Sequence, residues 1–275
     1  MKAFKAPSKK KLIVWAAVLL CLAVFCVVNN KYLTVTEYGY TDTRIKNGFR
    51  IVHISDLHNA EFGSDNKRLI ERIRSLDPDI IAVTGDLVDG SHTDIDVGID
   101  FCKACAEICP TYYVTGNHEH WLDDGDRERL FEGIRQGGTA ILDDECREIE
   151  INGDRVRLCG LDDESLYTDV PRDLLQGLGH DLPVILLAHE PQYFEDYCKY
   201  SPDLVLTGHA HGGQVRLPFI GGLVAPDQGF FPKYYEGEFT SGDTHMIISR
   251  GLGNSVIPVR VFDPPEIVCV NVSAI

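Results

Sequence analysis

The sequence predicts an α/β domain preceded by one N-terminal transmembrane helix. Three observations lead to this fold class: a long uncharged apolar run near the start, an alternation of strand-like and helix-like segments after it, and an ordinary globular composition. Of the 275 residues, 44% are hydrophobic and 25% are charged. This composition provides enough apolar material for a buried core and is too apolar for a disordered chain.

The N-terminal segment has a basic part followed by an apolar part. Residues 1–11 contain five lysines and no acidic residue, and residues 12–28 are apolar without a charge. A helix over 12–28 spans roughly 26 Å, at the short end for a bilayer core of about 30 Å. A cleaved signal peptide has a similar plan. Because no small-residue cleavage site precedes Asn29, we expect an uncleaved signal-anchor at 12–28.

The lysine excess predicts the orientation of this anchor, because positive residues stay on the cytoplasmic side. Residues 1–11 are therefore expected to be a cytoplasmic tail. Residues 31–275 are expected to form an extracytoplasmic domain, which makes the chain a single-pass protein of the cell membrane.

Strand-like and helix-like segments alternate after the anchor. Residues 49–55 and 79–84 are rich in β-branched side chains, which is typical of buried strands. Between them, Leu69 and Ile73 share one face of an expected helix with Ser64 as its N-cap. This order predicts one α/β domain with adjacent buried strands. The expected strands are 49–55, 79–84, 112–115, 139–142, 148–151, 155–159, 184–188, 204–207, 215–217, 244–249 and 267–272, with 31–47 as an edge strand or a stalk.

Nine cysteines are present, and seven of them follow the anchor. An odd number cannot pair completely within one chain. Cys102, Cys105 and Cys109 recur at helical spacing, which we interpret as a stripe of small buried side chains. The pairing of the other cysteines, and the compartment that it would indicate, stay open at this point.

Polar motifs follow five of the expected strands. They are Asp56-Leu-His58, Gly85-Asp86, Gly116-Asn117-His118-Glu119, Ala188-His189 and Gly208-His209-Ala-His211. The carboxyl ends of strands in α/β sheets meet at one crevice, where ligands bind. Aspartate, asparagine and histidine offer the oxygen and imidazole donors that suit Mn, Fe or Zn.

In this order the motifs resemble those of the calcineurin-like metallophosphoesterases, whose pattern is D-x-H, G-D, G-N-H-E/D, H and G-H-x-H. All five are present within residues 56–211. The resemblance implies a four-layer sandwich of two mixed β-sheets flanked by helices. It also implies a phosphoester hydrolase with two divalent metal ions.

By position, the resemblance also implies a role for each residue of these motifs. Asp56, His58 and His211 would hold the first metal, Asn117, His189 and His209 the second, and Asp86 would bridge both. A hydroxide between the two metals would attack phosphorus. His118 would hydrogen-bond the phosphate and protonate the leaving oxygen, with a structural hydrogen bond as its alternative role.

The segment after the last motif, from Gly213 in G-Q-V-R-L-P-F, resembles a membrane-associated bacterial subgroup of the family. Relatives there act on nucleotide-linked lipid A precursors or are assigned to the cell envelope. Apolar residues of this segment would suit a lipid chain, and the alternative is that they cap the core; they are Leu217, Phe219, Ile220, Leu223, Phe230 and Phe231. The candidate substrate contacts are Phe219 and, for phosphate, Arg216, Arg250 and Arg260.

The first hypothesis is a membrane-anchored phosphoesterase acting on a phosphodiester or pyrophosphate of an envelope or lipid-linked substrate. The alternatives are a tethered phosphodiesterase or phosphomonoesterase for soluble substrates, and a catalytically silent metal-binding scaffold. The complete ligand set argues against the scaffold. With 42 Asp+Glu against 26 Lys+Arg and a net charge of −16, the chain is not expected to bind nucleic acid. We expect a monomer.

Overall fold

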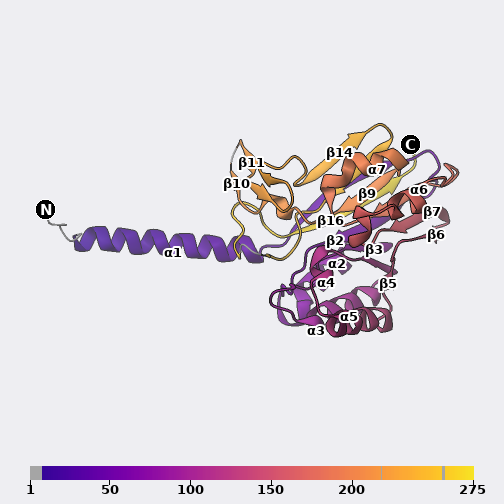
Figure 1. The fold of residues 1–275 in the computed structure, drawn as a ribbon. Helices are drawn as coiled ribbons and strands as arrows, with labels where there is room; N and C mark the ends of the chain where they lie inside the picture. Colours follow the sequence, from indigo (N-terminus) through magenta and orange to yellow (C-terminus); the bar gives the residue numbers. More distant parts are fainter. Residues whose placement is uncertain (1–7, 218, 256–257) are drawn as a thin grey trace.

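A long helix projects from the domain in the computed structural model, which describes residues 8–217, 219–255 and 258–275. This helix, α1 (Lys9–Lys31), has no buried residue and stands away from the rest of the chain (Figure 1). Its mean hydropathy reaches 2.8, and by length and composition it is the one helix among the described residues that is able to cross a membrane. Residues 1–7 of the expected basic tail lie outside the described residues.

The first sheet contains six strands in the order β1-β16-β2-β3-β4-β5. Strands β2 to β5 are mutually parallel, β16 runs antiparallel to β2, and β1 pairs in parallel with β16 at the edge. The segment 31–47 thus contributes an edge strand and not a stalk. The bounds are β1 (Thr34–Thr41), β2 (Phe49–Ile54), β3 (Ile80–Thr84), β4 (Thr111–Val114), β5 (Ala140–Ile141) and β16 (Glu266–Ser273).

The second sheet also contains six strands, in the order β14-β15-β9-β8-β7-β6. Its inner strands are parallel, and β14 and β6 are antiparallel to their neighbours. Sequence analysis did not predict β14. The bounds are β6 (Glu145–Ile151), β7 (Asp154–Gly160), β8 (Val184–Leu187), β9 (Leu204–Thr207), β14 (Gly237–Ser241) and β15 (Thr244–Ile248).

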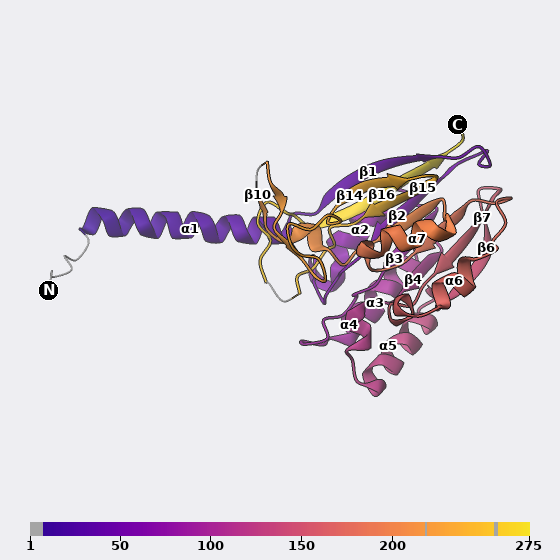
Figure 2. The same ribbon diagram turned by 45° about the horizontal axis from the view of Figure 1, so that its top comes forward.

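Three apolar clusters separate four layers, which confirms the expected sandwich. One cluster lies between the two sheets and contains Ile51 and Leu187. A second joins the first sheet, through Ile54, to α2, α3 and α5, and a third joins the second sheet to α6 and α7. Figure 2 shows helices on both sides of the paired sheets. The helix bounds are α2 (Lys67–Ser75), α3 (Ile95–Ala106), α5 (Asp124–Gln136), α6 (Val170–Leu175) and α7 (Phe194–Tyr197).

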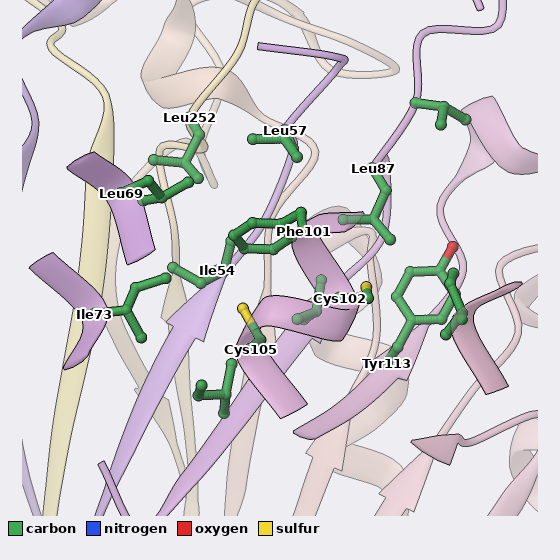
Figure 3. Close-up of a cluster of buried hydrophobic side chains, with 14 of the residues drawn as sticks. Ile54, Leu57, Leu69, Ile73, Leu87, Phe101, Cys102, Cys105, Tyr113 and Leu252 are labelled. Atoms are coloured by element: carbon green, nitrogen blue, oxygen red, sulfur yellow. The ribbon is translucent and has the colours of Figure 1, made fainter. Parts of the chain in front are cut away.

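The cysteine stripe lies in the core as expected. Cys102 and Cys105 are fully buried, and Cys109 packs against the same cluster; Figure 3 shows the first two beside Phe101. A disulfide joins Cys146 to Cys159, which face each other across β6 and β7. Only the tertiary structure identified this pair, since strand register decides which cysteines meet.

The expected helix start at Ser64 is wrong. A short 3-10 turn, η1 (Ser64–Asn66), comes first, and α2 begins at Lys67. Asn66 precedes α2 with a left-handed backbone, and the Ser64 hydroxyl donates to Asp65. The left-handed turn therefore interrupts the helix that a Ser64 cap would have started.

Candidate metal centre

The predicted ligands lie on loops at the carboxyl ends of β2, β3, β4, β8 and β9, and thus at the end of both sheets. Most of these loops contain residues whose backbone has the left-handed conformation. Positive φ is found at Asp56 (52°), His58 (44°), Asp86 (53°), His209 (63°) and His211 (48°). Such a conformation costs about 1–2 kcal/mol per non-glycine residue. Strained residues concentrated at one place are typical of a functional site.

The first cluster consists of Asp56, His58, Asp86 and His211, whose donor atoms lie within 4.8 Å of one another. His58 Nε2 is 3.3 Å from His211 Nε2, and His211 Nε2 is 3.6 Å from Asp56 Oδ1. All four residues are buried. Two imidazole nitrogens and two carboxylates thus point into one small space.

The second cluster consists of Asp86, His189 and His209. His189 Nε2 lies 3.1 Å from His209 Nδ1 and 3.3 Å from Asp86 Oδ2. The same Asp86 oxygen is 3.4 Å from His58 Nε2 in the first cluster. The Asp86 carboxylate therefore belongs to both clusters.

Asn117, the last of the seven predicted ligands, begins the short helix α4 (Asn117–His120). Its side-chain oxygen is buried and has no hydrogen-bond partner among the described residues. The next residue, His118, donates its backbone N–H to Asp86 Oδ1 at 2.9 Å, which places this end of α4 beside the shared carboxylate. An unpartnered buried oxygen at this point fits a metal ligand.

The two histidines of the first cluster are neutral, as metal ligands must be. Burial lowers the pKa of His58 to about 3, so its imidazole is neutral. Burial also lowers the pKa of His211 well below its usual value, and the Arg260 charge adds to this. Burial by itself would raise the pKa of Asp86, but the charges of His189 and His58 outweigh it and hold this pKa well below its usual value. In the second cluster burial alone would lower the pKa of His189, but the Asp86 charge outweighs it and raises this pKa well above its usual value.

This donor set fits the implied cofactors. Six of the seven predicted ligands form two buried His/Asp clusters that share a carboxylate, and the seventh presents a free oxygen. Nitrogen and oxygen donors without cysteine suit Mn, Fe or Zn equally. The clusters are consistent with two divalent metal ions, and the role of each single residue stays a prediction.

His118 lies next to the first cluster. It is 4% exposed, and its ring packs edge-on against His58 and also contacts Trp121. The Gly90 N–H donates to His118 Nδ1 at 3.0 Å. In the neutral ring the hydrogen is therefore on Nε2, which lies 3.1 Å from Ser255 Oγ. This tautomer can donate a hydrogen bond from Nε2, whereas the predicted proton transfer requires the imidazolium form, in which Nδ1 no longer accepts from Gly90.

Glu119 is a site residue that sequence reasoning missed, although it is the last letter of the G-N-H-E motif. Its buried carboxylate accepts N–H bonds from Asp86 (2.9 Å), Leu87 (2.8 Å) and Gly116 (2.7 Å). It thus joins the loops after β3 and β4. Burial, together with the Asp86 charge, raises the pKa of Glu119 to about 7.

Replacing Glu119 with glutamine is expected to weaken metal binding by about 10–100-fold, the usual cost of losing a group that orients ligands. The amide keeps one acceptor oxygen, and its NH₂ group faces backbone N–H donors instead of accepting from them. Metal titration of the purified chain measures the effect. An unchanged metal affinity would show that Asp86 keeps its position without the Glu119 carboxylate.

The predicted substrate contacts lie in two different environments. The Arg216 guanidinium pairs with Glu236, and Arg250 pairs with Glu266 at 3.0 Å and with Glu236 at 3.4 Å. Phe219 is fully exposed. The substrate roles of Arg216, Arg250 and Phe219 stay predictions.

For Arg260 the expected phosphate contact is wrong. The residue is fully buried, and its guanidinium donates to Gly253 O at 2.6 Å and to Asp263 Oδ2 at 3.0 Å. Its Nη2 also lies 3.5 Å from His211 Nδ1. Arg260 therefore contacts the predicted ligand His211 from the buried interior of the domain.

The comparisons with known proteins agree with this site. Residues 49–213 match the family model of the calcineurin-like phosphoesterases, and the chain belongs to this family of metal-dependent phosphoester hydrolases. It is 31% identical to the uncharacterised metallophosphoesterase YkuE of Bacillus subtilis over 226 residues, covering 80% of this chain and 77% of YkuE. An uncharacterised metallophosphoesterase of Aquifex aeolicus is 29% identical over 270 residues, covering 91% of this chain and 96% of the relative.

Some relatives are membrane proteins by name. A "transmembrane protein with metallophosphoesterase domain" of Danio rerio is 29% identical over 80% of this chain, which spans 52% of that relative. Among solved structures, phosphopantetheinyl hydrolase of Mycobacterium tuberculosis aligns with a TM-score of 0.48 and 13% identity, over 77% of this chain and 92% of that one.

Proposed function

We propose that this phosphoesterase is anchored in the cell membrane and hydrolyses a phosphodiester or pyrophosphate bond of a lipid-linked substrate. Residues 12–28 of α1 are the anchor, and residues 31–275 are the catalytic domain. One observation carries the proposal: a single loop connects the end of α1 directly to the metal centre.

The loop in question contains Gly253, Asn254 and Ser255. The Gly253 N–H donates to the backbone oxygen of Asp56 at 2.6 Å. The Asn254 side chain donates to Asn30 Oδ1 in the last turn of α1 at 2.7 Å, and the Ser255 hydroxyl lies 3.1 Å from His118 Nε2. Three consecutive residues thus contact a predicted metal ligand, the helix end and the predicted general acid.

This connection would bring the chemistry close to the bilayer. When α1 crosses a membrane, its last turn lies near the membrane surface, because the apolar run ends at Val28. The metal centre then lies at the level of lipid phosphates, which are the esters nearest to it. A substrate held in the membrane would reach the site without leaving the bilayer.

The chain's own residues have defined tasks in hydrolysis. Two divalent ions, held by the two clusters, would lower the pKa of water and neutralise charge on the phosphoryl oxygens. His118 would donate a hydrogen bond from Nε2 to a phosphoryl oxygen while Nδ1 accepts from Gly90, and as the imidazolium it would transfer the Nε2 proton to the leaving oxygen and return to the neutral ring. The rings of His58 and Trp121 pack against the His118 ring and restrict its orientation. Glu119 keeps the loops after β3 and β4 together.

Two features support an extracytoplasmic domain. The Cys146–Cys159 disulfide belongs to the chemistry of oxidising compartments, since cytosolic thiols are kept reduced. Lys9, Lys10 and Lys11 begin α1, and such clusters stay on the cytoplasmic side. The domain follows the other end of the helix.

The test compares a diacyl lipid pyrophosphate with its deacylated analogue, using the full chain in phosphatidylcholine vesicles with Mn²⁺. We expect kcat/KM to be about tenfold or more higher for the lipid, which corresponds to ~1.4 kcal/mol of transition-state binding. The Asn30→Ala variant should lose part of this preference, since it breaks the contact with Asn254, and should still hydrolyse soluble bis-p-nitrophenyl phosphate.

Equal kcat/KM for the two pyrophosphates would overturn the lipid-linked substrate and favour the tethered enzyme for soluble esters. A chain that hydrolyses neither the pyrophosphates nor bis-p-nitrophenyl phosphate with Mn²⁺, Fe²⁺ or Zn²⁺ would favour the silent scaffold.

A further inference from the structure

A group of exposed apolar side chains lies on the domain beside the end of α1. It comes from two small hairpins, β10–β11 (Arg216–Leu217 and Gly221–Gly222) and β12–β13 (Val224–Ala225 and Gly229–Phe230), and from one later residue. We call this group the apolar rim; it consists of Leu217, Phe219, Ile220, Phe230, Phe231 and Phe262. Phe219 is 110% exposed, Phe230 81% and Phe231 67%, so these side chains do not cap the core.

Two groups of side chains make up the rim. Leu217, Phe219, Ile220 and Phe262 line one shallow surface hollow. The second hairpin is joined to the first through Leu223, which lies between them and accepts the Phe231 N–H at 2.9 Å. Contiguous exposed apolar surface on a soluble domain marks an interaction site.

The backbone of the rim turns these side chains outward. Positive φ occurs at Phe219 (69°), Phe231 (58°) and Phe262 (54°), a region that bulky residues rarely occupy. Phe219 and Phe231 expose their rings to the outside, while the half-exposed Phe262 contacts the end of α1. Strain of this kind is typical of a site that binds a partner.

The position of α1 shows which partner fits. The Phe262 ring contacts the Phe25 ring edge-on, with 5.0 Å between the centroids. Phe25 lies within the apolar run 12–28, three residues before its end, which is about 4.5 Å along the helix. Both views place β10 beside this end of α1 (Figures 1 and 2). The rim is thus level with the last apolar turn of the helix.

We propose that the apolar rim inserts into the lipid bilayer beside α1 and forms a second membrane contact. This inference rests on the proposed anchoring of α1 and adds to it. A helix alone lets a domain tilt and rotate, whereas a helix and a separate apolar rim together hold it in one orientation. Aromatic side chains are well suited to the membrane interface.

The insertion would keep the metal centre facing the membrane. Asp227, at the tip of the β12–β13 hairpin, lies 3.0 Å from His209 Nε2, while Phe230 and Phe231 of the same hairpin belong to the rim. One hairpin therefore contacts both a predicted metal ligand and the proposed bilayer surface. A substrate would approach the metals from the plane of the membrane.

The test adds one tryptophan at a time to the full chain, in which native Trp121 is replaced with phenylalanine so that Trp15 is the one native tryptophan left, and it measures quenching by lipids brominated in their acyl chains. The variants are Phe219→Trp and Phe230→Trp, each in phosphatidylcholine vesicles. Ile275→Trp is the matched control, since Ile275 is 83% exposed and the C-terminus lies away from α1 in both views. Native Trp15 lies within α1, and in the chain with Trp121→Phe alone it reports on the anchor.

We expect brominated lipid to quench the emission added at positions 219 and 230 to an extent comparable with Trp15, and to leave that at position 275 unchanged. Quenched Trp15 with unquenched positions 219 and 230 would overturn the second contact and leave the anchor intact. Blue-shifted but unquenched emission there would also overturn it and indicate a protein partner. Unquenched Trp15 would overturn both the anchor and the rim insertion.

Discussion

Replacing Asp86 with asparagine is expected to reduce phosphoesterase turnover about 10³-fold in the presence of Mn²⁺. Asp86 Oδ2 faces His58 Nε2 at 3.4 Å and His189 Nε2 at 3.3 Å, so the substitution removes the carboxylate that both clusters share. Losing several kcal/mol of transition-state stabilisation gives this factor, at about 1.4 kcal/mol per tenfold. Turnover of bis-p-nitrophenyl phosphate and the metal content of the purified chain measure the effect.

Asp243→Asn is the matched control for this experiment, because Asp243 is exposed in a turn away from the two clusters. It removes the same charge from the chain and should leave turnover and metal content unchanged. Activity that survives both the Asp86 substitution and a chelator would contradict the two-metal mechanism.

Replacing His118 with asparagine is expected to lower kcat by about 10²–10⁴-fold, the usual contribution of a general acid, without loss of metal. His118 lies outside the two clusters that share Asp86, although it forms a further group with His58 and Asp89, and the Gly90 N–H bond to Nδ1 leaves Nε2 as the nitrogen that would exchange a proton. The loss should be larger for an ester with an alkyl alcohol leaving group than for a nitrophenyl ester. A nitrophenolate leaves without needing a proton, so only the alkyl ester requires the acid.

This dependence on the leaving group separates catalysis from structure. A structural histidine would lower the melting temperature and reduce both activities by the same factor. His180→Asn, at an exposed position, is the control for replacing a histidine as such and should leave both rates unchanged.

The local hydrophobic pattern was sufficient to predict much of the fold. The alternation in β2 places Val52 and Ile54 toward the helices and Ile51 toward the second sheet, as a period of two requires. The motif residues were found because each follows directly after an apolar strand. The start of α2 was placed wrongly, since the left-handed Asn66 leaves little trace in the hydrophobic pattern.

Contacts between residues far apart in the chain could not be predicted from the sequence. Glu119 was missed because its carboxylate acts on backbone groups of Asp86 and Leu87 more than thirty residues away. Arg260 was a candidate phosphate contact, yet it is fully buried and Asp263 pairs with it in the interior. Such burial depends on a partner that only the folded chain brings near.

By itself, the sequence determined the apolar helix, the α/β order, the family and the seven candidate ligands. The helix and the α/β order depend on short-range sterics and on the strand and helix periods, whereas the family and the ligands were implied by the resemblance of five local motifs. Only the tertiary structure decided that two sheets bring the ligands into two clusters around Asp86, and that Asn254 ties the metal centre to Asn30. It also decided that the apolar rim faces outward beside α1, because exposure depends on how distant segments pack.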